Sequence, residues 1–247
     1  MTDMPEALPE TLPKALLFDV FGTVVDWRGS IAREAKALLA TRGYTLDWDA
    51  FARDWRSRYQ PAMERIRSGA RGFVRLDVLH RENLVETLDA FGVTGLAETE
   101  IDHLNRAWHR LDPWPDAPSG LARLKRAAII ATLSNGNIAL MVNMARHGGL
   151  PWDAILGAEV ARAYKPQPEA YLRSCEALAL DPGETMLVAA HNSDLVAAAA
   201  TGMRTAFVLR AQEYGDPTHE DAKARGHYDI IADDFHDLAG KLGIAAN

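Results

Sequence analysis

Short apolar runs alternate with helical patterns over the second half of the chain. Runs typical of buried strands occupy 127–133, 185–190 and 204–209, with a weaker run at 228–232 and another near the amino terminus at 16–18. Helical periodicity separates the later runs at 120–126, 138–147, 169–178 and 193–201. Strands that alternate with helices in this way predict a parallel sheet with crossover helices.

The segment from residue 30 to residue 111 has a different pattern. It contains only helical periodicity, at 31–41, 48–68, 75–91 and 98–111, and glycines punctuate it. We therefore predict an α/β protein, with a Rossmann-like parallel sheet core formed by 14–29 and 112–247. A helical cap, 30–111, is inserted after the first strand, and the proline-rich segment 112–118 is the predicted return linker.

Composition narrows the class of protein. The chain has 247 residues and a formal net charge of −7, which argues against nucleic acid or an anionic membrane as a partner. No apolar run approaches the ~20 residues of a membrane span, and Met1–Pro13 resembles a loose tail rather than a signal peptide. The only cysteine is Cys175, which we expect to be a packed thiol. A cytoplasmic protein is the expectation.

The run at 16–18 ends on Asp19, and Gly22 then allows a turn. A buried strand would deliver this carboxylate to the carboxyl edge of the sheet, where open α/β sheets place their active sites. An aspartate that only caps a turn is the competing interpretation. An active-site role for Asp19 is favoured because polar residues also follow the later strands.

Three later segments carry such residues. Ser134 and Asn135 follow the run at 127–133, where they either present polar groups to an anion or form an ordinary turn. Lys165 precedes a proline that keeps it out of helical geometry, so its ammonium can approach Asp19 or remain solvated. Asp194 follows the run at 185–190, and a carboxylate at a helix start is its simpler explanation.

In this order the segments resemble the haloacid dehalogenase superfamily, whose motifs are a nucleophilic Asp, a Ser/Thr, a Lys and an acidic cluster. Within it the chain is most similar to the (S)-2-haloacid dehalogenases. The residues that carry this resemblance are Phe18–Thr23, Leu133–Gly136, Tyr164–Pro168 with Tyr171, and Trp55–Arg56 in the cap.

The resemblance implies that Asp19 attacks C2 of a short 2-haloalkanoate and that water hydrolyses the resulting ester to a 2-hydroxy acid. It also implies a role for each site residue. Thr23 and Lys165 orient Asp19, and Asp194 positions Lys165 or the water. Arg56 and Asn135 receive the halide. The substrate carboxylate is anchored by Ser134 and the backbone N–H groups of Val20 and Phe21, and the substrate is also contacted by Tyr171 and Asn192. The expected partner is a small halogenated carboxylate. Aromatic residues such as Phe21, Tyr171 and Trp55 would make the pocket crowded and favour small substrates, including fluoroacetate.

Phosphatases of this superfamily carry acids at the positions of Phe21 and Ala190, so we expect no metal and no other cofactor. Dehalogenases that the chain resembles carry Ser and Asn at Ala189 and His191. His191 either takes a proton from water or fills space. A magnesium-dependent phosphatase and a binding protein without activity are the alternatives. The resemblance further suggests a homodimer formed through the cap helices.

Overall fold

A computed structural model describes residues 12–246. Its main sheet has six parallel strands in the order β5-β4-β1-β6-β7-β8, which confirms the predicted fold class. The strands are β1 Ala15–Phe18, β4 Ile129–Ser134, β5 Ala154–Gly157, β6 Thr185–Ala189, β7 Arg204–Val208 and β8 Ile230–Ala232. After β1 the chain adds β4 and β5 on one side and β6 to β8 on the other. The point where strand order reverses, which is where such sheets bind ligands, therefore lies beside β1.

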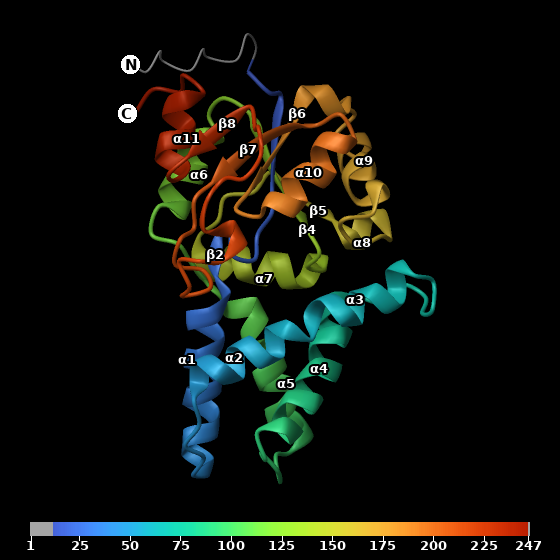
Figure 1. Cartoon of the computed structure of the whole chain (residues 1–247), viewed down its shortest axis with the longest axis vertical. Coiled ribbons are helices and arrows are strands. Elements are labelled where there is room, and N and C mark those ends of the chain that lie inside the picture. Colours follow the sequence, from blue (N-terminus) through green and yellow to red (C-terminus); the bar gives the residue numbers. More distant parts are fainter. Residues whose placement is uncertain (1–11, 247) are drawn as a thin grey trace.

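Both faces of the sheet are covered by helices (Figure 1). Leu16 and Phe18 pack in one apolar cluster and Leu17 packs in the other, as strand alternation requires. The first cluster includes α6 (Ala117–Leu124), α7 (Ile138–Gly148) and α11 (Phe235–Lys241), and the second includes α8 (Ala158–Ala161), α9 (Pro168–Glu176) and α10 (Asn192–Ala200).

The cap is a separate layer of helices beyond the carboxyl ends of β1, β4 and β6 (Figure 1). It comprises α1 Trp27–Leu39, α2 Trp48–Ser57, α3 Tyr59–Arg67, α4 Leu76–Ala90 and α5 Glu98–Asn105, with short 3-10 turns at Ala40–Arg42 and Arg106–Arg110. The chain leaves the core through β2 (Val25–Asp26) and returns through β3 (Asp112–Pro113), and these two strands pair antiparallel. Both crossings are thereby held together at one edge of the cap.

The structure differs from the sequence prediction at two places. The predicted helix 48–68 is two helices, because Pro61 has no N–H to donate to Ser57 and its ring crowds that carbonyl, so the chain turns at Arg58. Strand β5 was not predicted. It has only four residues, and two of them are half-buried at the sheet edge, so no strong apolar run marks it. Among residues 12–246, no helix is long and apolar enough to cross a bilayer.

Candidate active site

The register of β1 places Asp19 at the carboxyl edge of the sheet. Phe18 pairs with Thr132 of β4 on one side and with Val188 of β6 on the other, and the Asp19 N–H donates to the Val188 carbonyl at 3.0 Å. Asp19 therefore leaves the sheet between the two strands whose ends carry the other predicted site residues.

Three side chains hold the Asp19 carboxylate. Lys165 Nζ donates to Oδ1 at 2.8 Å, Thr23 Oγ1 donates to Oδ2 at 2.7 Å, and His191 Nδ1 lies 3.0 Å from Oδ2. Burial alone would raise the pKa of this carboxyl group, but Lys165 and His191 outweigh it and hold the pKa below its ordinary value. Asp19 is therefore ionised at neutral pH and fixed in orientation.

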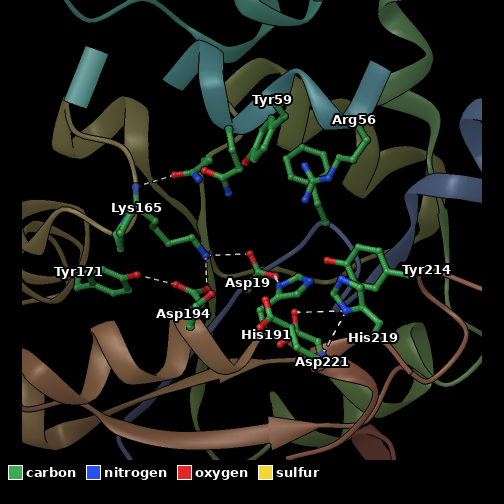
Figure 2. A pocket seen from close by; sticks show the side chains of 16 residues that line it. Asp19, Arg56, Tyr59, Lys165, Tyr171, His191, Asp194, Tyr214, His219 and Asp221 are labelled. Carbon is green, nitrogen blue, oxygen red and sulfur yellow. Dashed lines mark hydrogen bonds and ion pairs between the residues drawn. The ribbon is translucent and has the colours of Figure 1, made fainter. Parts of the chain in front are cut away.

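Lys165 lies between two carboxylates. Its Nζ also donates to Asp194 Oδ2 at 2.5 Å, and Tyr171 OH donates to Asp194 Oδ1 at 2.6 Å (Figure 2). Burial acts to lower the pKa of Lys165, whereas Asp19 and Asp194 raise it above its ordinary value, so the ammonium keeps its charge. The Lys165 N–H donates to Asn135 Oδ1 at 2.8 Å, which fixes its backbone to the end of β4.

His191 also lies between two carboxylates. Its Nδ1 faces Asp19, and its Nε2 lies 3.0 Å from Oε2 of Glu213, a side chain that is 1% exposed and also accepts a hydrogen bond from Trp27 Nε1 at 2.9 Å. Burial acts to lower the pKa of His191, but Glu213 and Asp19 raise it well above its ordinary value. The imidazole is therefore a cation while Asp19 is ionised.

Glu213 was missed by the sequence prediction. It lies in the loop after β7, far along the chain from its partner Trp27, and no local pattern marks it. Gly22 provides a structural signal, because it has a φ of +88° and a Cβ there would lie 2.0 Å from Glu213 Oε1. The turn after Asp19 thus needs glycine both for its backbone angle and for room beside Glu213.

A cavity of about 280 Å³ opens above Asp19, between core and cap. Ten of its lining residues are labelled in Figure 2. The lining residues are Asp19, Phe21, Arg56, Tyr59, Gln60, Asn135, Lys165, Pro166, Tyr171, His191, Ser193, Asp194, Tyr214, His219, Glu220 and Asp221. The eight predicted residues among them come from six separate segments, and the fold brings them to one place.

Arg56 provides a half-buried cation on the cap side of this cavity. Its Cζ lies 4.1 Å from the centre of the Tyr59 ring, and the rings of Phe21 and Trp27 also pack near it, at 5.8 and 5.5 Å. Its Nη1 is buried and has no hydrogen-bond partner among the described residues. A buried, unpaired guanidinium N–H group can receive an anion that enters the cavity.

The other predicted site residues lie outside the lining. Ser134 is fully buried, and its Oγ accepts from the Gly136 N–H at 3.0 Å. Thr23 is fully buried beneath Asp19, and Val20 is also buried. Asn192, predicted to contact substrate, instead holds the loop after β7, since its Oδ1 accepts from Tyr228 OH at 2.8 Å and its Nδ2 donates to Asp221. The N–H groups of Val20 and Phe21 make no hydrogen bond within residues 12–246.

The residues present do not fit a magnesium ion. Of the carboxylates that line the cavity, Asp19 and Asp194 are both bound by the Lys165 ammonium, and the positions where the superfamily's phosphatases carry acids are Phe21 and Ala190, whose side chains have no oxygen. Across the described part of the chain, no group of three or more His, Cys, Asp or Glu side chains is arranged to hold a metal ion.

Comparison with known proteins agrees with this geometry. The model of the haloacid dehalogenase-like hydrolases matches residues 13–202. The chain belongs to this family. This confirms the resemblance inferred from the motifs, and it makes the protein a hydrolase.

Several dehalogenases are similar to this haloacid dehalogenase-like hydrolase over most of its length. The crystal structure of a defluorinating L-2-haloacid dehalogenase is 51% identical with a TM-score of 0.92, covering 94% of this chain and 95% of that one. A second L-2-haloacid dehalogenase structure is 45% identical with a TM-score of 0.90, covering 94% and 100%. The (S)-2-haloacid dehalogenase of Xanthobacter autotrophicus is 29% identical, over 81% of this chain and 76% of its own.

Proposed function

We propose that this protein hydrolyses short 2-haloalkanoic acids, both (S)-2-haloacids and haloacetates, to 2-hydroxy acids through an ester on Asp19. One observation carries the proposal: an ionised, oriented carboxylate shares a cavity with Arg56, whose buried Nη1 has no hydrogen-bond partner within residues 12–246. The similarity to 2-haloacid dehalogenases supports the same activity.

In the first step an Asp19 carboxylate oxygen attacks C2 of the substrate from the face opposite the halogen. The new C–O bond forms as the carbon–halogen bond breaks, the halide leaves with the bonding electrons, and configuration at C2 inverts. Lys165 and Thr23 hold one carboxylate oxygen each, so the nucleophile approaches in a fixed orientation.

Negative charge develops on the departing halogen. Arg56 is a cation of the cavity whose Nη1 has no hydrogen-bond partner among the described residues, and the ring of Phe21 lies beside it. We assign halide stabilisation to Arg56, with Asn135 on the core side. A preorganised donor at such a position contributes about 10²–10³ in rate.

The substrate carboxylate needs donors of its own. In the part of the chain that the structure describes, the N–H groups of Val20 and Phe21 have no acceptor, and they belong to the turn that follows the nucleophile. We assign them the substrate carboxylate. Ser134 remains a predicted contributor, although in this structure its hydroxyl oxygen is already bonded to the Gly136 N–H.

The second step hydrolyses the ester, and His191 is the candidate base. Ester formation removes the negative charge of Asp19, which is one of the two carboxylates that raise the pKa of His191. The imidazolium then loses its proton to solvent more readily. Neutral His191, oriented by Glu213, takes a proton from water as the water attacks the Asp19 carbonyl carbon. The bond between the carbonyl carbon and the substrate oxygen then breaks, and that oxygen takes the second proton of the water. The 2-hydroxy acid leaves, Asp19 is again a carboxylate and His191 is again an imidazolium.

We also propose that the reaction needs no metal, because the Lys165 ammonium already balances the two carboxylates that a magnesium ion would need. A cytoplasmic location and a homodimer formed through the cap remain predictions from the sequence. Fluoroacetate and longer 2-haloacids belong among the substrates to be tested.

The test is free halide release from chloroacetate and (S)-2-chloropropionate, with excess EDTA and an Asp19→Asn variant as control. We expect release by the wild type alone. No release, together with magnesium-dependent phosphate release from an aryl phosphate, would assign the protein to the phosphatases instead. Parallel assays with fluoro-, chloro- and bromoacetate determine the halogen range.

A further inference from the structure

The backbone of Lys165 is held from two sides. Its N–H group donates to Asn135 Oδ1, from the core, at 2.8 Å. Its carbonyl oxygen accepts a hydrogen bond from Arg67 Nη1, from the last residue of cap helix α3, at 3.0 Å. The residue that holds the nucleophile is therefore positioned in part by the cap.

Arg67 binds groups of the cap as well as the Lys165 carbonyl, so it links the position of the cap to that of Lys165. Its side chain is only 13% exposed, and its guanidinium also donates to Gln60 Oε1 at 3.1 Å and to Glu64 Oε2 at 2.8 Å. Gln60 lines the cavity above Asp19. One half-buried guanidinium thus joins a cavity wall of the cap to the backbone of the Lys165 loop.

The surrounding contacts dock the same loop onto the cap. Tyr164 OH donates to the Val74 carbonyl at 2.9 Å, and the rings of Tyr164 and Phe73 stack at 5.3 Å. Gln167 Nε2 donates to the Arg67 carbonyl at 3.4 Å. Figure 1 shows the end of α3 reaching beneath the core on the side of α8. The loop from Tyr164 to Gln167 is consequently part of the cap–core interface.

We propose that Arg67 is a positioning residue, which fixes Lys165 against Asp19 when the cap is seated on the core. This inference rests on the proposed function, because it concerns the same nucleophile. A cap displaced from the core would release the Lys165 carbonyl, and the ammonium would lose its fixed approach to Asp19. Arg67 does not contact Asp19 and is not itself a lining residue of the cavity, so it acts on the nucleophile through Lys165.

The test compares Arg67→Met, Arg67→Lys and the control Arg65→Met. Arg65 is an exposed arginine on the same helix, two residues before Arg67. For Arg67→Met with chloroacetate we expect kcat and the single-turnover rate of halide release to fall about tenfold to a hundredfold, the range of a hydrogen bond to a charged group. KM should change much less, because no substrate contact is lost. Arg67→Lys should recover part of the rate, and Arg65→Met should match the wild type.

Hydrogen exchange of the peptide spanning Tyr164–Gln167 provides a readout that needs no activity. Faster exchange there in Arg67→Met, with unchanged exchange in the sheet, supports the proposal. An unchanged kcat in Arg67→Met, beside an active wild type, would overturn the proposal. So would a fall of both Tm and rate in Arg67→Met that Arg67→Lys does not reverse. If the wild type released no halide, the proposed function would fail, and the exchange result alone would decide whether Arg67 positions the loop.

Discussion

Replacing His191 by glutamine should separate the two chemical steps. After the substitution, Asp19 keeps the Lys165 bond on Oδ1 and the Thr23 bond on Oδ2, at 2.8 and 2.7 Å. A glutamine amide can still donate toward Asp19. We therefore expect the rate of ester formation to change by less than about tenfold, the equivalent of one ordinary hydrogen bond.

Ester hydrolysis should respond far more strongly to His191→Gln. An amide cannot take a proton from water, and loss of a general base slows a step by about 10²–10⁴-fold. Glu213 does not replace His191, because it lies behind the imidazole, is 1% exposed and is not part of the cavity lining. The ester on Asp19 should therefore accumulate.

Rapid-quench measurement of halide shows this directly. His191→Gln should release one halide per active site in a fast burst and then turn over slowly, and intact-protein mass spectrometry should detect one carboxymethyl group from chloroacetate. His103→Gln, a change at an exposed histidine of α5, serves as control. A variant that loses the burst and the steady rate to the same extent, with no adduct, would refute the role of His191 in hydrolysis.

Three further predictions concern neighbouring groups. Gly22→Ala should lower Tm and steady turnover together, because the backbone at residue 22 has a φ of +88° and the new Cβ would collide with Glu213. Thermal unfolding and a halide assay measure the two effects, and an unchanged Tm would contradict the stated geometry. Lys165→Met should abolish activity and destabilise the fold at pH 7 by about 3–5 kcal/mol, the cost of removing one partner from a buried charge group. In the wild type the pKa of Asp19 is lowered, so ionised Asp19 stabilises the folded protein above the unfolded pKa of ~3.9, and this contribution is lost as pH falls. In Lys165→Met the loss of folding free energy at acid pH, measured by denaturant titration, should be smaller. Cys175→Ala should keep wild-type turnover, and iodoacetamide should not inactivate the native protein, since burial raises the pKa of this thiol; rapid inactivation would show that it is accessible.

Three of the residues predicted from the sequence share one property, because each follows an apolar strand. Asp19 follows β1, Asn135 follows β4 and Asp194 lies just beyond β6, so the parallel arrangement alone brings them to one edge. The place of Lys165 before proline left a solvated lysine open, and its role at the site was predicted from the family resemblance. Strand ends are readable from a single sequence because burial of the strand leaves a contrast with the polar residue after it.

Residues brought in by tertiary packing were not predictable in the same way. Glu213 and Tyr214 lie in a long loop after β7, and their contacts with Trp27 and His191 depend on how that loop folds over the site. Arg67 was one of several helical arginines in the cap, and nothing local distinguishes it from Arg65. Its role depends on where α3 ends relative to Lys165, which no periodicity encodes.

The central place of β1 has a consequence for the order in which this protein can fold. Ala15 pairs with Ile129 and with Thr185, so neither neighbour of the first strand exists until the whole cap has been synthesised. The nascent chain must carry an unpaired apolar strand throughout that interval, while the cap helices can already form local contacts. Such long-range pairing slows folding and leaves the strand open to aggregation. Conditions that limit chaperone supply during expression should therefore reduce the yield of folded protein more than its final stability suggests.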